Sequence, residues 1–249
     1  MRGGARAAAA AVAVLLLAGF IALGTWQVER RAWKLDLIER VDQRVHAPAV
    51  AAPGPASWPE VSAARDEYRH VRVTGVFLHD REALVQAVTT LGSGFWVLTP
   101  LRQPDGRVVF VNRGFVPPEA RQRATRNGSE PAGETTVTGL LRLTEPKGGF
   151  LRSNDAASGR WYSRDVQAMA AARGLAEVAP YFIDADATPS TGEREWPAGG
   201  LTVVTFQNNH LVYALTWYTL ALMVVAAAWR FLRQGPEGRA DPGSPSVGD

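Results

Sequence analysis

Cysteine is absent from the sequence, which excludes a disulfide framework, a thiolate metal site, a cysteine nucleophile and covalent haem attachment through a C-x-x-C-H motif. Only three methionines occur, one of them the initiator, so a methionine-rich copper carrier is excluded as well. The sequence also has no G-x-S-x-G, Walker or G-x-G-x-x-G motif. Common signatures of hydrolases and nucleotide-binding proteins are therefore missing.

A concentrated positive charge is missing too. The 249 residues carry 27 basic and 24 acidic side chains, for a formal net charge of +3, and the basic residues form no stripe that could neutralise phosphates. We therefore expect no nucleic-acid partner. The mean hydropathy of −0.09 argues against a transporter with many spans. The length suits one domain with appendages.

The first of two apolar segments begins near the N-terminus. Residues 7–23 include no charged side chain, and residues 24–26 extend this segment to 20 residues. That length matches a hydrocarbon core of ~30 Å, and Trp26 suits the membrane interface. A cleaved signal peptide is the alternative, with Arg2 and Arg6 as its basic region. The apolar run slightly exceeds the usual length for such a peptide, which favours a transmembrane helix over residues 7–26.

The second apolar segment lies near the C-terminus. Residues 211–229 carry no charge, and Arg230 and Arg233 follow them. A buried helix of a soluble domain is the alternative, but the length and the terminal arginines favour a transmembrane helix over residues 210–229. The tail that follows, residues 230–249, is rich in glycine, proline and serine and is expected to be disordered.

The positive-inside rule predicts the orientation of both helices. Arg230 and Arg233 follow the second span, whereas residues 201–210 before it are uncharged, so we expect residues 230–249 to be cytoplasmic. Two spans then place residues 1–6 on the same side and residues 27–206 in the periplasm. Three basic residues just after the first span argue against this orientation; they are Arg30, Arg31 and Lys34. The N-terminal segment does not resemble a transit peptide, which favours a bacterial inner membrane.

The sequence between the spans predicts a β-rich domain. Residues 29–44 are expected to continue the first helix, and residues 47–59 to form a linker. Strands are expected at 71–76, 83–88, 95–98, 108–112, 135–143, 181–183 and 201–205, with turns at 92–94 and 104–106 and with Pro100 ending one strand. A helix over residues 164–173 is expected to be capped by Ser163 and followed by Gly174. The predicted fold is an α+β membrane protein with a mainly antiparallel barrel or sandwich.

His210 is the candidate for chemistry, because it lies where the second span meets the interface. An ionisable group at a membrane edge is rare, and imidazole is a common axial ligand of haem. In a helix it shares a stripe with Tyr213, Ala214, Trp217 and Ala221. The alternative is an interfacial histidine that reaches water or bonds Asn209.

Two other polar groups are weaker candidates. His79 and Asp80 are adjacent, like a metal-binding pair, but no second histidine motif accompanies them, so a polar turn is the preferred interpretation. Asn112 and Gly114 flank Arg113 at the end of an expected strand. Because asparagine and glycine tolerate positive φ, the chain could turn sharply there and present Arg113.

Four blocks of the sequence resemble the Surfeit-locus-one family of cytochrome c oxidase assembly factors. These blocks are LGTWQVER (residues 23–30), GFWVLTPL (94–101), VNRGFVP (111–117) and NHLVYALTWY (209–218). Their order and spacing cover nearly the whole chain. One departure is Phe115, where the family commonly has tryptophan. The resemblance also implies two spans with a large domain on the outer face.

The resemblance implies a non-enzymatic role, in which the protein holds non-covalent haem a for insertion into the largest oxidase subunit. His210 corresponds to the proposed iron ligand of the family, with Tyr213 and Trp217 beside it. Trp26 and Gln27 are expected to meet it from the first helix. The stripe of Ala18, Ala22 and Trp26 would permit close helix approach. The implied partners are the oxidase subunit, the bilayer and a haem a synthase.

Two other classes of function stay open. A haem-independent scaffold could stabilise a nascent oxidase subunit through the outer domain. A membrane-bound enzyme acting on haem, such as a synthase, fits less well, because such enzymes need several spans and more histidines than the four present here.

Overall fold

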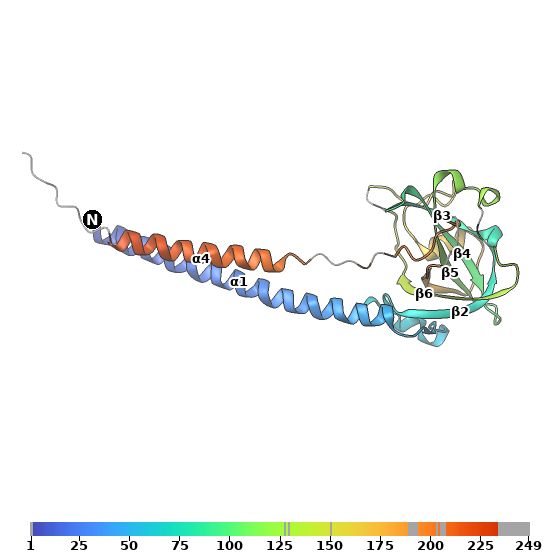
Figure 1. Cartoon of the computed structure of the whole chain (residues 1–249), viewed down its shortest axis with the longest axis horizontal. Coiled ribbons are helices and arrows are strands. Elements are labelled where there is room, and N and C mark those ends of the chain that lie inside the picture. The colour runs from blue at the N-terminus through green and yellow to red at the C-terminus, as the bar shows by residue number, and fades with distance from the viewer. Residues whose placement is uncertain are drawn as a thin grey trace, which may run out of the picture. The chain divides into compact units, whose positions relative to one another are not determined.

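The computed structural model describes residues 2–126, 128, 130–149, 151–188, 194–202, 204 and 208–233. The chain forms two compact units: a helical unit from residues 1–38 and 206–249, and a β unit from residues 39–205. Helix α1 (Arg2–His46) is continuous and contributes residues to both units, whereas α4 (His210–Arg233) belongs to the helical unit (Figure 1). The expected helical continuation over residues 29–44 is confirmed.

Within the described residues, two helices are long and apolar enough to cross a membrane, the portion of α1 from Ala7 onward and α4. They lie side by side and antiparallel (Figure 1). Gln27 of α1 contacts His210 of α4, and Phe20 of α1 contacts Trp217 of α4. Residue numbers therefore decrease along α1 where they increase along α4, as expected for antiparallel helices.

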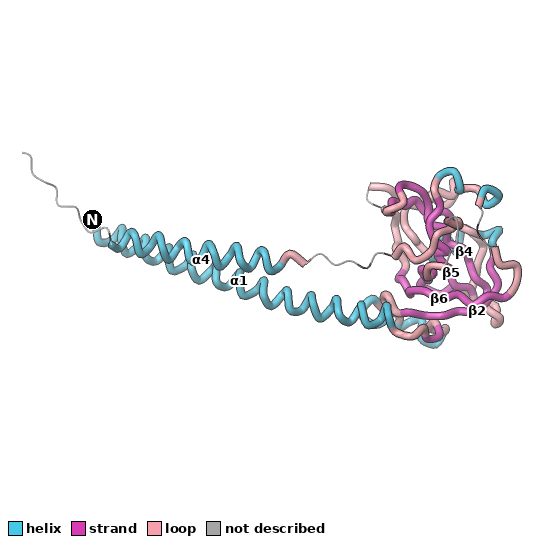
Figure 2. Tube along the Cα trace, in the orientation of Figure 1, coloured by secondary structure: helices cyan, strands magenta, loops and turns pink. Residues whose placement is uncertain are grey.

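The β unit is a closed five-stranded barrel with two further strands (Figure 2). Its strands are β1 (Val50–Ala51), β2 (His70–Phe77), β3 (Ala83–Thr89), β4 (Gly92–Arg102), β5 (Val108–Val116), β6 (Glu134–Leu143) and β7 (Val178–Ala185). The order is β1-β2-β6-β7-β5-β4-β3, and an additional pairing of β2 with β4 closes the ring. All pairings are antiparallel except β1–β2 and β5–β7. The expectation of a mainly antiparallel barrel or sandwich is confirmed, and the structure shows the barrel.

Strand β5 is buried along almost its whole length because both of its faces are covered. Val109 and Val111 belong to the core inside the barrel, together with Leu141 and Ile183. Phe110 points to the other face and belongs to a second core beneath helix α3 (Val166–Ala172). Successive side chains of a strand point to opposite faces, so a strand between two cores is apolar without alternation.

The cap of α3 differs from the expected one. Asp165, not Ser163, is the N-cap residue, and its carboxylate accepts a hydrogen bond from the Ala168 amide at 3.1 Å. The Ser163 hydroxyl instead donates to the Glu145 carbonyl at 2.6 Å. Gly174 lies beyond the helix with φ of +60°, as expected for a C-terminal glycine.

Pro100 does not end its strand, because β4 continues to Arg102 and begins already at Gly92. On one edge, β4 pairs with β3 as far as Leu98 and then with β2 from Leu101. The Pro100 carbonyl accepts from the Leu78 amide at 2.8 Å, which places the proline nitrogen on this edge between the two partners. A missing N–H is tolerated at that position, since neither ladder uses it.

Three other expectations about strands and turns are wrong. Residues 92–94 were expected to form a turn, but they belong to strand β4. Strand β5 runs through Asn112 and Gly114 to Val116 instead of ending there. In the described part of 201–205, namely residues 201, 202 and 204, no strand forms.

The expected linker over residues 47–59 includes the two-residue strand β1 and most of the short 3-10 helix Pro55–Glu60. The turn at 104–106 is confirmed and joins β4 to β5, with Gly106 at φ of +88°.

Candidate functional site

The two helices of the helical unit face each other along a stripe with coiled-coil spacing. On α1 the least exposed positions in the apolar half are 13, 17, 20, 24 and 27, and on α4 they include 210, 214, 217, 221 and 224. Alternating steps of three and four residues are typical of left-handed helix pairs. The expected stripe is wrong: Ala18, Ala22 and Trp26 are exposed, and Gly24 is the small residue of α1 in the contact.

Gly24 allows the aromatic residue Tyr218 to pack directly on the α1 backbone. A Cβ atom added at Gly24 would lie 2.7 Å from Cε1 of Tyr218. The Tyr218 hydroxyl is 3.3 Å from Oγ1 of Thr25, so it also finds a polar partner on α1. One turn further toward the N-terminus of α1, Phe20 stacks on Trp217 with ring centroids 5.8 Å apart. These contacts fix the register of the two helices.

His210 and Gln27 form the polar contact of this pair. Nδ1 of His210 lies 2.7 Å from Oε1 of Gln27, and the glutamine is only 9% exposed. An amide oxygen can only accept a hydrogen bond, so Nδ1 of His210 carries the hydrogen. In neutral imidazole the other ring nitrogen, Nε2, then keeps its lone pair. This is the tautomer that a metal ligand needs, held by a partner on the other helix.

The structure therefore brings three of the expected site residues into the facing stripe, His210, Gln27 and Trp217. Trp26 and Tyr213 lie outside the stripe and are 53% and 55% exposed. The His210 ring contacts Gln27 rather than Asn209, the alternative partner that the sequence suggested.

His79 does not form the metal-binding pair that its neighbour Asp80 could suggest. Nε2 of His79 donates to the Pro131 carbonyl at 3.1 Å, and His79 lies in a short 3-10 turn, which confirms a polar turn. Among the described residues no group of three or more histidine, aspartate or glutamate side chains is placed to hold a metal ion.

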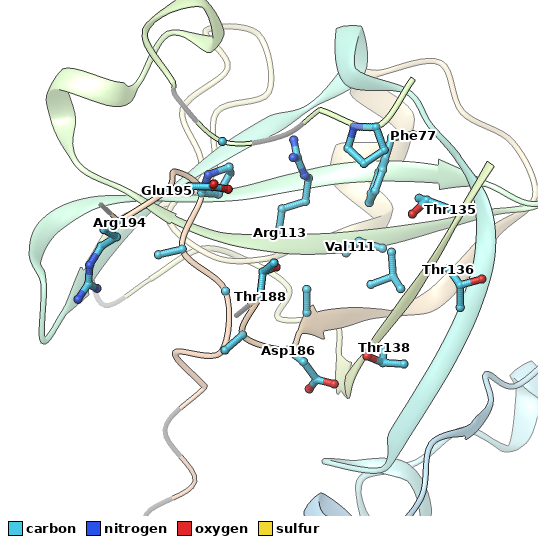
Figure 3. Close-up of a pocket in the computed structure, with 18 residues that line it drawn as sticks. Phe77, Val111, Arg113, Thr135, Thr136, Thr138, Asp186, Thr188, Arg194 and Glu195 are labelled. Atoms are coloured by element: carbon cyan, nitrogen blue, oxygen red, sulfur yellow. The ribbon is translucent and has the colours of Figure 1, made fainter. Parts of the chain in front are cut away.

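Arg113 is not presented on a turn but lies within β5 and is largely buried. Burial lowers the pKa of the Arg113 guanidinium, while the carboxylate of Glu130, 4.0 Å away, opposes this effect. The guanidinium carbon is 5.4 Å from the centre of the Phe77 ring. Figure 3 shows the side chain extending among the residues that line a cavity of about 810 Å³. Thr135, Thr136 and Thr138 of β6 give one side of this cavity a polar character.

Sequence reasoning missed a buried ionic centre in the β unit. The Asp184 carboxylate, 4% exposed, accepts hydrogen bonds from Arg142 at 3.0 Å and from Arg164 at 3.3 Å. Asn112 donates to the same carboxylate at 2.8 Å, as does Thr202 at 2.9 Å. Burial opposes the charge of Arg142, but Asp184 and a hydrogen bond to Glu67 raise its pKa overall. The signal available in the sequence was a single acid within the otherwise apolar run of β7.

The chain combines a β barrel with two helices of membrane-spanning length, and His210 and Gln27 join these two helices. These features define a class of two-span membrane protein with one large β domain. The SURF1 family matches residues 14–222 of this chain. Surfeit locus protein 1 of Rattus norvegicus is 38% identical over 232 residues, which cover 86% of this chain and 72% of the rat protein. The chain belongs to the SURF1 family.

Two further relatives show the same extent of similarity. Surfeit locus protein 1 of Homo sapiens is 37% identical over 235 residues, covering 86% of this chain and 74% of the human protein. A SURF1-like protein of Monosiga brevicollis is 36% identical over 227 residues, covering 85% of this chain and 82% of that protein. The similarity thus extends over both helices and the barrel, not over one domain alone.

Proposed function

We propose that this protein is a non-enzymatic assembly factor for cytochrome c oxidase, which binds haem a at its two membrane helices and assists its insertion into the largest oxidase subunit. Membership in the SURF1 family, which is generally linked to assembly of this oxidase, supports the general role. The haem site rests on one observation, the 2.7 Å contact between His210 and Gln27.

That contact suits an axial ligand of haem. Gln27 accepts the hydrogen on Nδ1, so Nε2 of His210 is left with the lone pair that coordinates iron. The porphyrin supplies four nitrogen ligands when bound, so the protein needs only one or two more. This agrees with a chain whose described residues hold no cluster of metal-binding side chains. With no cysteine in the sequence, attachment would be non-covalent.

One flank of the helix pair is closed by a side-chain contact and the other is open, so we place the cofactor on the open flank. Thr25 and Tyr218 contact each other and close one flank. At about 100° per residue, Trp26 and Tyr213 project toward the opposite flank, where each keeps more than half of its surface exposed. Flat, exposed aromatic rings on the side of His210 offer stacking surface to a porphyrin.

The membrane arrangement follows from the same helices. We place residues 7–26 and 210–229 across the inner membrane, with both termini cytoplasmic and with residues 27–206 in the periplasm. Arg230 and Arg233 after α4 support this orientation. An apolar cofactor could then reach His210 from the lipid phase, which suits a protein that receives haem a from a synthase and releases it to the oxidase.

The visible spectrum of the purified protein tests the haem site. We expect full-length protein from cells that make haem a to carry an a-type band, and His210→Ala to lose it. His46→Ala is the matched control, because His46 is an exposed histidine at the end of α1 whose ring contacts Asp42 of the same helix. An unchanged band in His210→Ala, with the helices intact by circular dichroism, would remove His210 from the site.

A second candidate is the haem-independent scaffold. The cavity of about 810 Å³ on the β unit favours it, because its charged and threonine-rich lining could contact a polar segment of an oxidase subunit. Protein that is always free of haem, yet copurifies with the oxidase subunit, would support the scaffold over the haem carrier.

A further inference from the structure

The turn of α1 that follows Gln27 carries two basic side chains, Arg30 and Arg31, which differ in their contacts. Arg30 lies over the indole of Trp33, with its guanidinium carbon 3.9 Å from the ring centre. Arg31 is partly buried and makes no hydrogen bond, ion pair or ring contact with any residue in the described part of the chain. Arg31 is therefore the cation at this level that remains available to a partner.

The neighbours of Arg31 on the helix reinforce this availability. Positions three and four residues away are adjacent on a helix surface. For Arg31 these are Gln27, Val28, Lys34 and Leu35, which include another cation and no acid. None of these neighbours offers a carboxylate to Arg31, so its guanidinium can take an anionic partner from outside the helix.

Arg31 also lies in line with the candidate iron ligand. It is four residues beyond Gln27 on the same face of α1, so it lies about 6 Å further along the helix axis, away from the apolar segment. Helix α4 begins at His210, level with Gln27, so no part of α4 faces the turn that carries Arg31. A ligand held by His210 would meet Arg31 at its edge on the aqueous side.

We propose that Arg31 binds the propionate carboxylates of the haem and so determines which edge of the porphyrin faces water. This inference rests on the proposed function, since it takes His210 as the iron ligand. Guanidinium groups bind carboxylates through two parallel hydrogen bonds, which give orientation as well as affinity. With the propionates at Arg31, the apolar tail of haem a points back along the apolar part of the helices.

This role also accounts for a conflict in the sequence. Arg30, Arg31 and Lys34 follow the first span on the side where the positive-inside rule disfavours basic residues, given Arg230 and Arg233 after the second span. A basic residue that binds a ligand at such a position is no evidence about which side of the membrane it lies on. For Arg31 the reason is the anionic edge of the cofactor, and for Arg30 it is the contact with Trp33.

The experiment compares haem a with its dimethyl ester, which lacks the two negative charges. Full-length protein in detergent is titrated with each form, and binding is followed by visible absorption. We expect wild type to bind the free acid about tenfold more tightly than the ester, the effect of one charge-assisted hydrogen bond or more. Arg31→Gln should bind both forms equally and at the affinity of the ester. Arg31→Lys should restore part of the preference.

Arg30→Gln is the matched control and should keep the wild-type preference, because Arg30 is engaged with Trp33. A preference retained in Arg31→Gln, or lost equally in Arg30→Gln, would overturn the role of Arg31. If wild type binds both forms equally and His210→Ala abolishes that binding, the role of Arg31 fails and the proposed function stands. If wild type binds neither form, the proposed function fails and the inference fails with it.

Discussion

His210 and Gln27 are 183 positions apart in the sequence, yet Nδ1 of the histidine lies 2.7 Å from the amide oxygen of the glutamine. The contact joins the first residue of α4 to a buried position of α1, at the level where the apolar part of α1 ends. A polar pair at the end of an apolar helix interface fixes both the axial register and the tautomer of the imidazole. It therefore links the packing of the helices to the chemistry available at Nε2.

Gln27→Leu should weaken haem binding while the helix pair persists. The leucine is similar in size but accepts no hydrogen bond, so His210 loses the group that fixes its ring. Loss of such a partner typically costs ~10–100-fold in metal affinity. The ratio of haem to protein after purification measures this effect. Thr25→Val is the control, because it removes the polar contact on the other flank, with Tyr218, and should leave the ratio unchanged.

Gly24→Leu should separate the two helices, since a side chain there collides with the Tyr218 ring. Overpacking of a tight contact costs about 1–3 kcal/mol. The absence of native cysteine makes the measurement simple: cysteines introduced at positions 13 and 224, level in this register, should cross-link in an otherwise unchanged protein. Gly19→Leu is the control, because nothing lies within 4 Å of a Cβ at that position. Equal cross-linking in both glycine variants would contradict the packing described for Gly24.

Asp184→Ala should destabilise the β unit by about 3 kcal/mol, because it leaves Arg142 and Arg164 without their shared buried carboxylate. The measurement is the free energy of unfolding in urea, followed by tryptophan fluorescence of the full-length protein. Asp155→Ala offers the comparison, since the ion pair of Asp155 with Arg160 is on the surface and should contribute little. Similar stabilities for the two variants would show that Asp184 is not the centre of the network.

His70 should make the β unit less stable as the pH rises. Its two ring nitrogens lie 2.9 Å from the Ala47 carbonyl and 2.8 Å from the Asp186 carboxylate, and both are acceptors, so the geometry requires imidazolium. Burial opposes the charge, but the bonds to Asp186 and Ala47 raise the pKa of His70 above its usual 6.5. The stabilisation is complete below about pH 6.5 and is lost as the pH rises through the raised pKa.

The stability difference between wild type and His70→Gln, measured by urea unfolding, should therefore be larger near pH 6 than near pH 9. His79→Gln controls for histidine loss in general, because the His79 ring donates to the backbone at Pro131. A difference that is constant with pH would contradict the charged state of His70.

The sequence predicted the features that depend on local patterns. Apolar runs of membrane length predicted α1 and α4, and the turn at residues 104–106 predicted the hairpin of β4 and β5. The sequence did not decide between a barrel and a sandwich, because the pairing of Val76 with Arg102, which closes the ring, joins distant strands without a local signal. Pro100 was wrongly predicted to end a strand. The strand tolerates a residue without an N–H there only because β4 changes its partner from β3 to β2 at this point, and the sequence carries no local signal for that change.

The candidate site shows a similar division. His210 was a candidate because it precedes the second apolar segment, and Gln27 was a candidate only through the family resemblance; the structure brings the two side chains into contact. The stripe of Ala18, Ala22 and Trp26 was wrong because small residues in α1 occur on several faces, so their spacing does not identify the one in contact. Asp184 was missed because a lone acid in a strand gains meaning only when Arg142 and Arg164 converge on it.

The position of β7 has a consequence for biosynthesis. This strand, Val178–Ala185, lies between β5 and β6, although it follows both in the chain. Until it has left the ribosome, β5 and β6 each keep an unpaired edge, and such edges are templates for aggregation. A chain truncated before residue 178 is therefore an open sheet, and the ring can close only after Ala185, the last residue of β7, has been made.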